Sequence, residues 1–164
     1  MTPLILASTS IYRKELLSKL GISFEVRKPL FDEDSAKLEV SWLKPAELCL
    51  FLGKEKARSL ANAQNCVIGS DQMLVLGSQI LGKPGTVEKA RAQLQQMQGR
   101  EHELLTSVSV FFQGQEHSFL HRAHMKMLPL SEAQIHTYVE ADQPLDCAGS
   151  YKIEKQGLAL FEKI

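Results

Sequence analysis

The sequence is poor in the residues that mark extracellular, membrane and nucleic-acid-binding proteins. Its three cysteines, Cys49, Cys66 and Cys147, are too widely spaced for a disulfide framework or a zinc site. Its 19 lysines and arginines balance 19 aspartates and glutamates, which argues against a general nucleic-acid-binding surface. No apolar run approaches the roughly 20 residues of a membrane span, and no signal peptide precedes the first apolar run. We therefore expect a cytoplasmic protein that binds neither membrane nor nucleic acid.

Helical and extended patterns alternate along the chain, which predicts one α/β domain with a mixed sheet. Helices are predicted at residues 10–20 and 45–62, after a cap at Thr86, and from a capping box at 131–134 to about residue 140. Strands are predicted at residues 4–7, 22–26, 66–69, 73–76, 79–81, 103–112, 116–128 and 157–162. Residues 28–41 are predicted to form a polar loop, and Leu16, Leu17 and Leu20 to face inward from the first helix.

The junction between the first strand and the first helix suits an anionic ligand. The apolar run 4–7 ends at Ser8 and Ser10, and Arg13 and Lys14 follow in the first helical turn. A helix N-terminus offers unpaired N–H groups and usually prefers acidic residues, so a cationic first turn indicates a partner such as a polyphosphate. An ordinary serine cap followed by solvated cations would give the same pattern.

Asp71 lies between the apolar runs 66–69 and 73–76, where a carboxylate without a partner would be costly to bury. A metal ion, a cation or several hydrogen-bond donors must therefore compensate it. Asp71 either binds a divalent metal or activates water, or it is a turn residue bonded to backbone amides.

Other charged residues allow two interpretations each. Lys83, in a stiff Gly-Lys-Pro turn, suits phosphate, although solvated loop lysines are as common. Glu33 could share a metal with Asp71, although acidic loops are mostly only solvated. Lys56 lies in a predicted helix, where a solvated outer face is the default. His102 is either a ligand-facing donor or a structural histidine.

Six segments occur in a fixed order: Ser8-Thr9-Ser10-x-x-Arg13, Asp32-Glu33, Lys56-Ala57, Gly69-Ser70-Asp71-Gln72, Gly82-Lys83-Pro84 and Gly99-x-x-His102-x-x-x-Thr106. In this order the chain resembles the Maf-like family of nucleotide pyrophosphatases over nearly its whole length. The resemblance implies an α/β fold with a twisted mixed sheet flanked by helices, in two lobes around a central cleft, as in inosine triphosphatases. It also implies conversion of a nucleoside triphosphate to a monophosphate and pyrophosphate, and it allows a homodimer.

Within that family the sequence is most similar to the 7-methyl-GTP pyrophosphatase branch. It has Ser70-Asp71-Gln72 where the dTTP/UTP branch typically has Ala-Asp-Thr, and Tyr12 and the segment 147–154 support the same branch. A dTTP/UTP pyrophosphatase and a non-catalytic nucleotide-binding regulator of cell division are the alternatives. Family members continue into a Gly-Leu-Pro-Leu segment and a final helix, so we expect the domain at residues 1–164 to lack that segment.

The resemblance also implies roles for single residues. Asp71 would be the proton acceptor, with Glu33 and Lys83 as further catalytic residues, and Glu33 and Asp71 would hold a divalent metal, magnesium or manganese. Phosphate oxygens would be bound by Ser8, Ser10, Arg13, Lys56 and Lys83. Base selectivity would be set by Tyr12, Gln72 and Glu154.

Overall fold

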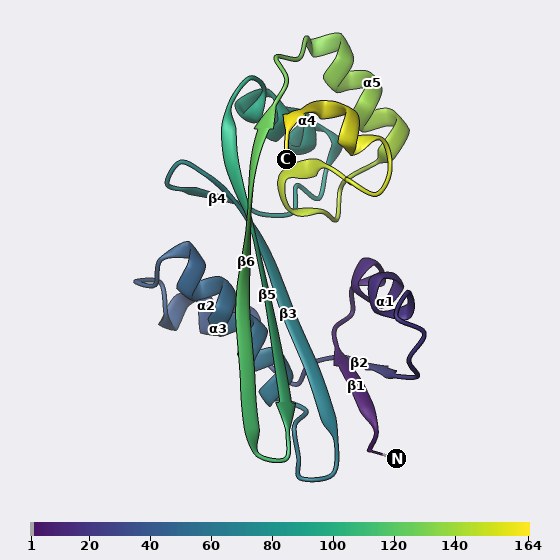
Figure 1. Ribbon diagram of the computed structural model, residues 1–164. Coiled ribbons are helices and arrows are strands. Elements are labelled where there is room, and N and C mark those ends of the chain that lie inside the picture. Colours follow the sequence, from purple (N-terminus) through teal and green to yellow (C-terminus); the bar gives the residue numbers. More distant parts are fainter. Residues whose placement is uncertain (1) are drawn as a thin grey trace. The chain divides into compact units, whose positions relative to one another are not determined.

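The computed structural model describes residues 2–164, and its chain alternates between helices and strands (Figure 1). The α-helices are α1 (Ile11–Ser18), α2 (Glu33–Glu39), α3 (Pro45–Arg58), α4 (Val87–Met97) and α5 (Glu132–Asp142), and two 3-10 segments are η1 (Ala148–Ser150) and η2 (Gln156–Leu160). The strands are β1 (Leu4–Ala7), β2 (Glu25–Arg27), β3 (Cys66–Leu76), β4 (Gln79–Leu81), β5 (Glu101–Phe112), β6 (Gln115–Met127) and β7 (Phe161–Lys163).

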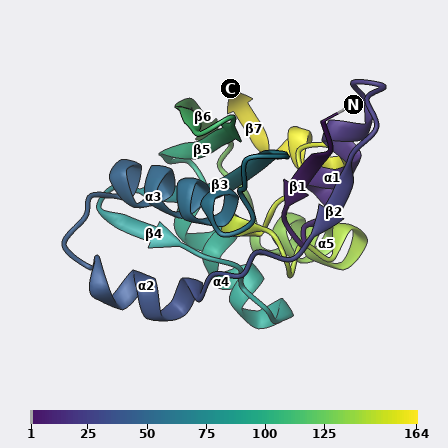
Figure 2. The ribbon, with the colours of Figure 1, turned by 90° about the horizontal axis from the view of Figure 1, so that it is seen from below.

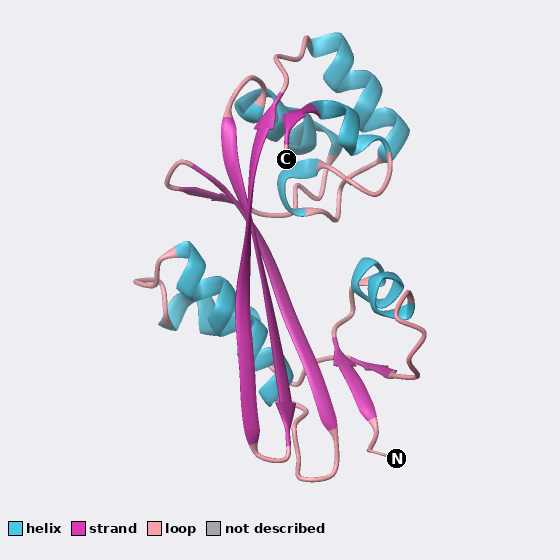
Figure 3. Cartoon of the chain, in the orientation of Figure 1, coloured by secondary structure: helices cyan, strands magenta, loops and turns pink. Residues whose placement is uncertain are grey.

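The strands form one mixed sheet, as predicted (Figure 3). Its order is β2-β1-β3-β5-β6-β7, and β4 pairs with β3. β1 is parallel to both β2 and β3, whereas β4 is antiparallel to β3 and β7 to β6. In the β1–β3 register Ala7, the last residue of β1, pairs with Gly69, so Ser8 leaves the sheet at the point where β3 continues through Ser70 and Asp71.

The chain divides into two compact units, in agreement with the two lobes implied by the resemblance. Unit 1 comprises the residues up to Asp71 and Thr106–His121, and unit 2 comprises Gln72–Leu105 and Arg122–Ile164. Each unit has its own apolar core. In unit 1 this core includes Ile5, Ala7, Ala57 and Val67, and in unit 2 it includes Leu74, Ala90, Leu94, Met97, Met127, Ile135 and Val139.

Helix caps and turns act as the sequence predicts. Thr86 accepts a hydrogen bond from the backbone N–H of Lys89 at the start of α4, and Ser131 and Gln134 form the capping box of α5. The turn between β5 and β6 places both Gln113 (φ 50°) and Gly114 (φ 76°) in the left-handed region, which suits a tight hairpin between twisted strands.

The prediction of a polar loop at residues 28–41 is wrong, because α2 lies there. Asp32 caps this helix: its carboxylate accepts hydrogen bonds from the backbone N–H groups of Asp34 and Ser35, both 3.2 Å away. The acidic residues that suggested a solvated loop are therefore the cap and first turn of a helix, where the helix dipole favours negative charge. Figure 2 shows α2 as a separate short helix before α3.

Three other predictions need correction. Residues 66–76 form one continuous strand rather than two. Asp71 does not interrupt this strand, because its carboxylate pairs with the ammonium group of Lys56. The predicted strand at 157–162 is mostly η2, and only Phe161–Lys163 is extended. α1 has no buried residue, and Leu16 and Leu20 are 50% and 68% exposed, so its predicted inward face is wrong.

Candidate active site

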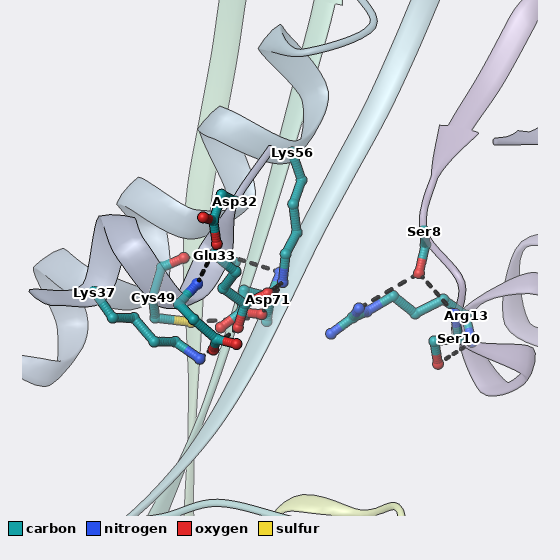
Figure 4. Close-up of polar contacts among 11 residues, drawn as sticks. Ser8, Ser10, Arg13, Asp32, Glu33, Lys37, Cys49, Lys56 and Asp71 are labelled. Carbon is teal, nitrogen blue, oxygen red and sulfur yellow. Dashed lines mark hydrogen bonds and ion pairs between the residues drawn. The ribbon is translucent and has the colours of Figure 1, made fainter. Parts of the chain in front are cut away.

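The ammonium group of Lys56 lies between two carboxylates in unit 1. Its Nζ is 2.5 Å from Oδ1 of Asp71 and 2.8 Å from Oε2 of Glu33 (Figure 4). The side chains of Lys56 and Asp71 are only 11% and 9% exposed. A cation therefore compensates the buried Asp71, and the default prediction of a solvated outer face is wrong for Lys56.

Two glycines bring Lys56 and Asp71 together. A Cβ atom on Gly69 in β3 would collide with the carbonyl oxygen of Gly53 and the backbone nitrogen of Ala57, both in α3. The backbones of helix and strand can approach this closely only because Gly69 lacks a side chain. Since Lys56 lies within the same turn of α3 and Asp71 shortly follows Gly69, the close approach sets the distance between ammonium and carboxylate.

Glu33, the first residue of α2, contacts two lysines. Its carboxylate is 2.5 Å from Nζ of Lys37, one turn later in the helix, and 2.8 Å from Nζ of Lys56. Burial by itself raises the pKa of Glu33, but the hydrogen bonds and charges of Lys37 and Lys56 outweigh it and lower the pKa to about 2. Glu33 is therefore an ionised carboxylate at neutral pH, available to accept hydrogen bonds or to bind a cation.

The start of α1 forms a second polar cluster in unit 1. Oγ of Ser8 accepts hydrogen bonds from the backbone N–H of Ser10 (3.1 Å) and from Nη1 of Arg13 (3.5 Å), and Oγ of Ser10 accepts from the backbone N–H of Arg13 (3.4 Å). The first turn contains no acidic residue. Figure 4 shows Arg13 extending away from α1 on the side that faces the Lys56 cluster. Hydroxyls, backbone amides and a guanidinium thus lie together, an arrangement whose chemistry suits an anion.

The remaining predicted site residues come from both units. Tyr12 is half-buried in α1 in unit 1, whereas Gln72, Lys83 and Glu154 are exposed and belong to unit 2. The carbonyl of Gly82, which precedes Lys83, accepts a hydrogen bond from Nε2 of Gln93 at 3.1 Å, and this anchors the Gly-Lys-Pro turn.

His102 lies in the core of unit 2, which favours the structural interpretation of the two left open. It is 4% exposed, its Nε2 is 3.2 Å from the hydroxyl of Tyr151, and its ring contacts those of Tyr151 and Phe161. Burial lowers the pKa of His102 to about 4, so its imidazole is neutral at physiological pH.

Sequence reasoning missed three residues around Asp71 and Glu33. Lys37 could have been found from its spacing of four residues from Glu33, had the helix been recognised. Cys49 and Ser107 contact the backbone of Asp71 from distant positions in the chain, and their spacing in sequence gives no signal. Burial raises the pKa of the Cys49 thiol, which keeps it a neutral donor to the carbonyl of Asp71.

Comparison with known proteins decides the family. The profile of the family described as "Maf-like protein" matches residues 3–164. The chain belongs to the Maf-like family. The resemblance carried by the six motif segments is therefore confirmed.

Two curated relatives of this Maf-like chain have the same name. A 7-methyl-GTP pyrophosphatase of Bdellovibrio bacteriovorus is 46% identical over 161 residues, covering 98% of this chain and 84% of the relative. A 7-methyl-GTP pyrophosphatase of Pseudomonas putida is 41% identical, covering 99% of this chain and 84% of the relative. Among solved structures, a HAM1 protein from Coxiella burnetii matches with a TM-score of 0.49 and 15% identity over 98% of this chain and 91% of that one.

Proposed function

We propose that this protein is a nucleoside triphosphate pyrophosphatase that hydrolyses 7-methyl-GTP to 7-methyl-GMP and pyrophosphate. Membership of the Maf-like family and relatives of that name at 46% and 41% identity support the proposal. The structural observation that carries it is the cluster in which Lys56 joins the carboxylates of Asp71 and Glu33. Burying the charges of Lys56 and Asp71 carries a desolvation cost that a hydrophobic pair would not have, so such a cluster points to chemistry.

In this proposal Asp71 is the general base. Its carboxylate takes a proton from a water molecule whose oxygen attacks the α-phosphorus, while the bond from that phosphorus to the α–β bridging oxygen breaks and pyrophosphate leaves. Ser8, Ser10 and Arg13 bind phosphate oxygens at the start of α1, and Lys83 and Lys56 offset the charge of the phosphates. Most of the rate enhancement would come from positioning and charge stabilisation.

The proposal includes a divalent metal, magnesium or manganese. Glu33 and Asp71 fit such an ion, because their two hard carboxylate oxygens already converge on one cationic group, Nζ of Lys56. Residues 2–164 contain no group of three or more histidine, cysteine, aspartate or glutamate side chains placed to hold a metal. The protein would thus supply two carboxylates and the substrate phosphates the other ligands, with the ion adding positive charge at the phosphates.

Base choice is assigned to Tyr12, Gln72 and Glu154. Methylation at N7 makes the guanine ring cationic, so stacking on an aromatic ring such as that of Tyr12 gains about 0.5–2 kcal/mol. Glu154 would accept hydrogen bonds from the guanine N1–H and amino group, and Gln72 would contact a further base edge. Glu154 is exposed, and the nearby ammonium group of Lys152 donates hydrogen bonds to the carbonyls of Asp142 and Gln143. Both observations suit a Glu154 carboxylate that binds the base.

Cellular location and assembly also remain proposals. Within the part of the chain that the structure describes, the three cysteines form no disulfide, which suits a reducing cytoplasm. Among residues 2–164 no helix is both long and apolar enough to cross a membrane. A homodimer is proposed on the family resemblance alone.

The deciding experiment measures pyrophosphate release with 7-methyl-GTP, GTP, dTTP and UTP, each with and without Mg²⁺ or Mn²⁺. We expect the highest kcat/KM for 7-methyl-GTP. Asp71→Asn keeps the shape of the side chain but cannot act as a base, so it should lose at least about 100-fold in kcat. A preference for dTTP or UTP would contradict the proposed substrate, and the absence of release with any nucleotide would contradict an enzymatic role.

A further inference from the structure

The backbone of Asp71 is fixed by a side chain from the neighbouring strand. Oγ of Ser107, in β5, accepts a hydrogen bond from the backbone N–H of Asp71 at 3.1 Å and donates one to the carbonyl of Cys49 at 2.6 Å. The thiol of Cys49 in turn lies 3.6 Å from the carbonyl of Asp71. A closed set of contacts therefore joins α3, β3 and β5 at the residue that carries the proposed base.

The side chain of Ser107 is closely packed against α3. Ser107 is fully buried, and a Cβ atom on Gly53 would collide with its Oγ. Gly53 is also the residue whose carbonyl approaches Gly69, so the two close contacts share one helical position. A buried hydroxyl with both a donor and an acceptor partner has a defined orientation, because any rotation would leave one partner unpaired.

We propose that Ser107 is a positioning residue for the reaction, holding the backbone of Asp71 so that its carboxylate stays aligned for proton transfer. Its hydroxyl bonds to the backbone of Asp71 and of Cys49, so Ser107 acts through Asp71. This inference rests on the proposed pyrophosphatase function. The positioning effect should appear in kcat rather than KM, because the hydroxyl of Ser107 holds the backbone of the proposed base rather than a proposed phosphate-binding group.

Ser109 offers a matched control. It lies two residues further along β5, is also fully buried, and its Oγ accepts a hydrogen bond from Oγ of Ser118 at 2.8 Å. Ser107→Ala and Ser109→Ala each remove one buried hydroxyl, so both should lower the melting temperature. Only Ser107→Ala should lower kcat for 7-methyl-GTP, by about 10-fold or more, with KM changed less than about 2-fold.

The decisive measurement is a double-mutant cycle with Asp71→Asn. If Ser107 acts through Asp71, adding Ser107→Ala to Asp71→Asn should cause almost no further loss of the residual rate. A full additional loss would overturn the inference, as would equal kcat in the two serine variants of an active enzyme. If Ser107→Ala does not fold, Ser107→Cys keeps the shape of the side chain with a larger atom that is a weaker hydrogen-bonding group, and it should show the same loss of kcat. A wild-type protein that releases no pyrophosphate from any nucleotide would overturn the proposed function and this inference together.

Discussion

Single residues in this protein obtain their chemical state from neighbours that come from other elements. Glu33 remains an anion because Lys37 and Lys56 reach it from α2 and α3, and Asp71 tolerates burial because Lys56 reaches it from α3. Lys56 could not have been assigned to either carboxylate from the sequence, because sequence spacing does not show which side chains of different elements meet. What the sequence did indicate was that Asp71 needs compensation, and that inference followed from its apolar flanks alone.

The depressed pKa of Glu33 predicts a contribution to acid stability. The folded pKa is about 2 and the ordinary value is 4.5, so between these pH values the unfolded chain binds a proton that the folded protein does not. Stability from Glu33 is therefore present above pH 4.5 and is lost as the pH falls towards 2. We expect Glu33→Gln to be less stable than wild type at pH 7, with the difference shrinking as the pH falls through this window.

Urea unfolding at several pH values between 2 and 7 measures this difference. Glu39→Gln is the control, because Glu39 is exposed at the other end of α2. A difference between wild type and Glu33→Gln that stays constant with pH would show that the two lysines do not hold the carboxylate in solution as they do in the structure.

At the scale of elements, the site depends on how closely α3 approaches β3. The sequence predicted a helix from Pro45 and a strand from Cys66, and both exist. It did not predict that they meet at Gly53 and Gly69. A glycine in a sequence permits a close backbone approach, but the sequence does not show which segment approaches. The same limit explains α2: its cap residues were visible, but its short length and acidic start resemble a loop.

Gly69→Ala should therefore damage both stability and turnover. The added methyl group would meet backbone atoms of Gly53 and Ala57, which cannot move aside as a flexible side chain could. We expect a loss of about 1–3 kcal/mol or more in the free energy of unfolding. We also expect a lower kcat, because separating α3 from β3 separates Lys56 from Asp71.

Gly82→Ala is the stability control, since a Cβ there meets nothing within 4 Å. It should change the free energy of unfolding by no more than about 0.5 kcal/mol. Equal unfolding curves for the two variants would contradict the close approach.

At the scale of the whole molecule, the predicted site residues are divided between the two units. Ser8, Arg13, Glu33, Lys56 and Asp71 belong to unit 1, and Lys83 belongs to unit 2. The order of motifs was sufficient to predict the family, and local apolar patterns and caps were sufficient to predict the mixed sheet and most helices. Ion pairs and backbone contacts between distant segments were not predictable, because the distance between two residues in the sequence does not show whether they meet in the fold.

Lys83→Ala tests whether unit 2 takes part in turnover. If Lys83 neutralises the leaving pyrophosphate, its loss should cost a few kcal/mol in transition-state stabilisation, measured as a fall in kcat/KM of about 100-fold. Lys54→Ala is the comparison, because Lys54 pairs with Glu116 at 2.8 Å and is 38% exposed. We expect it to change the barrier by no more than about 0.5 kcal/mol. Similar kinetics in the two variants would remove Lys83 from the proposed site.

The two-residue turn between β5 and β6 sets the register of the strand that carries Ser107. Side chains in a strand alternate between faces, so a slip of one residue would move Ser107 and Ser109 from the buried face to the opposite one. Gln113 and Gly114, both with positive φ, connect the strands with no spare residue to absorb such a slip. A hairpin turn that contains none of the proposed site residues thus determines where the hydroxyl that bonds to the backbone of Asp71 lies.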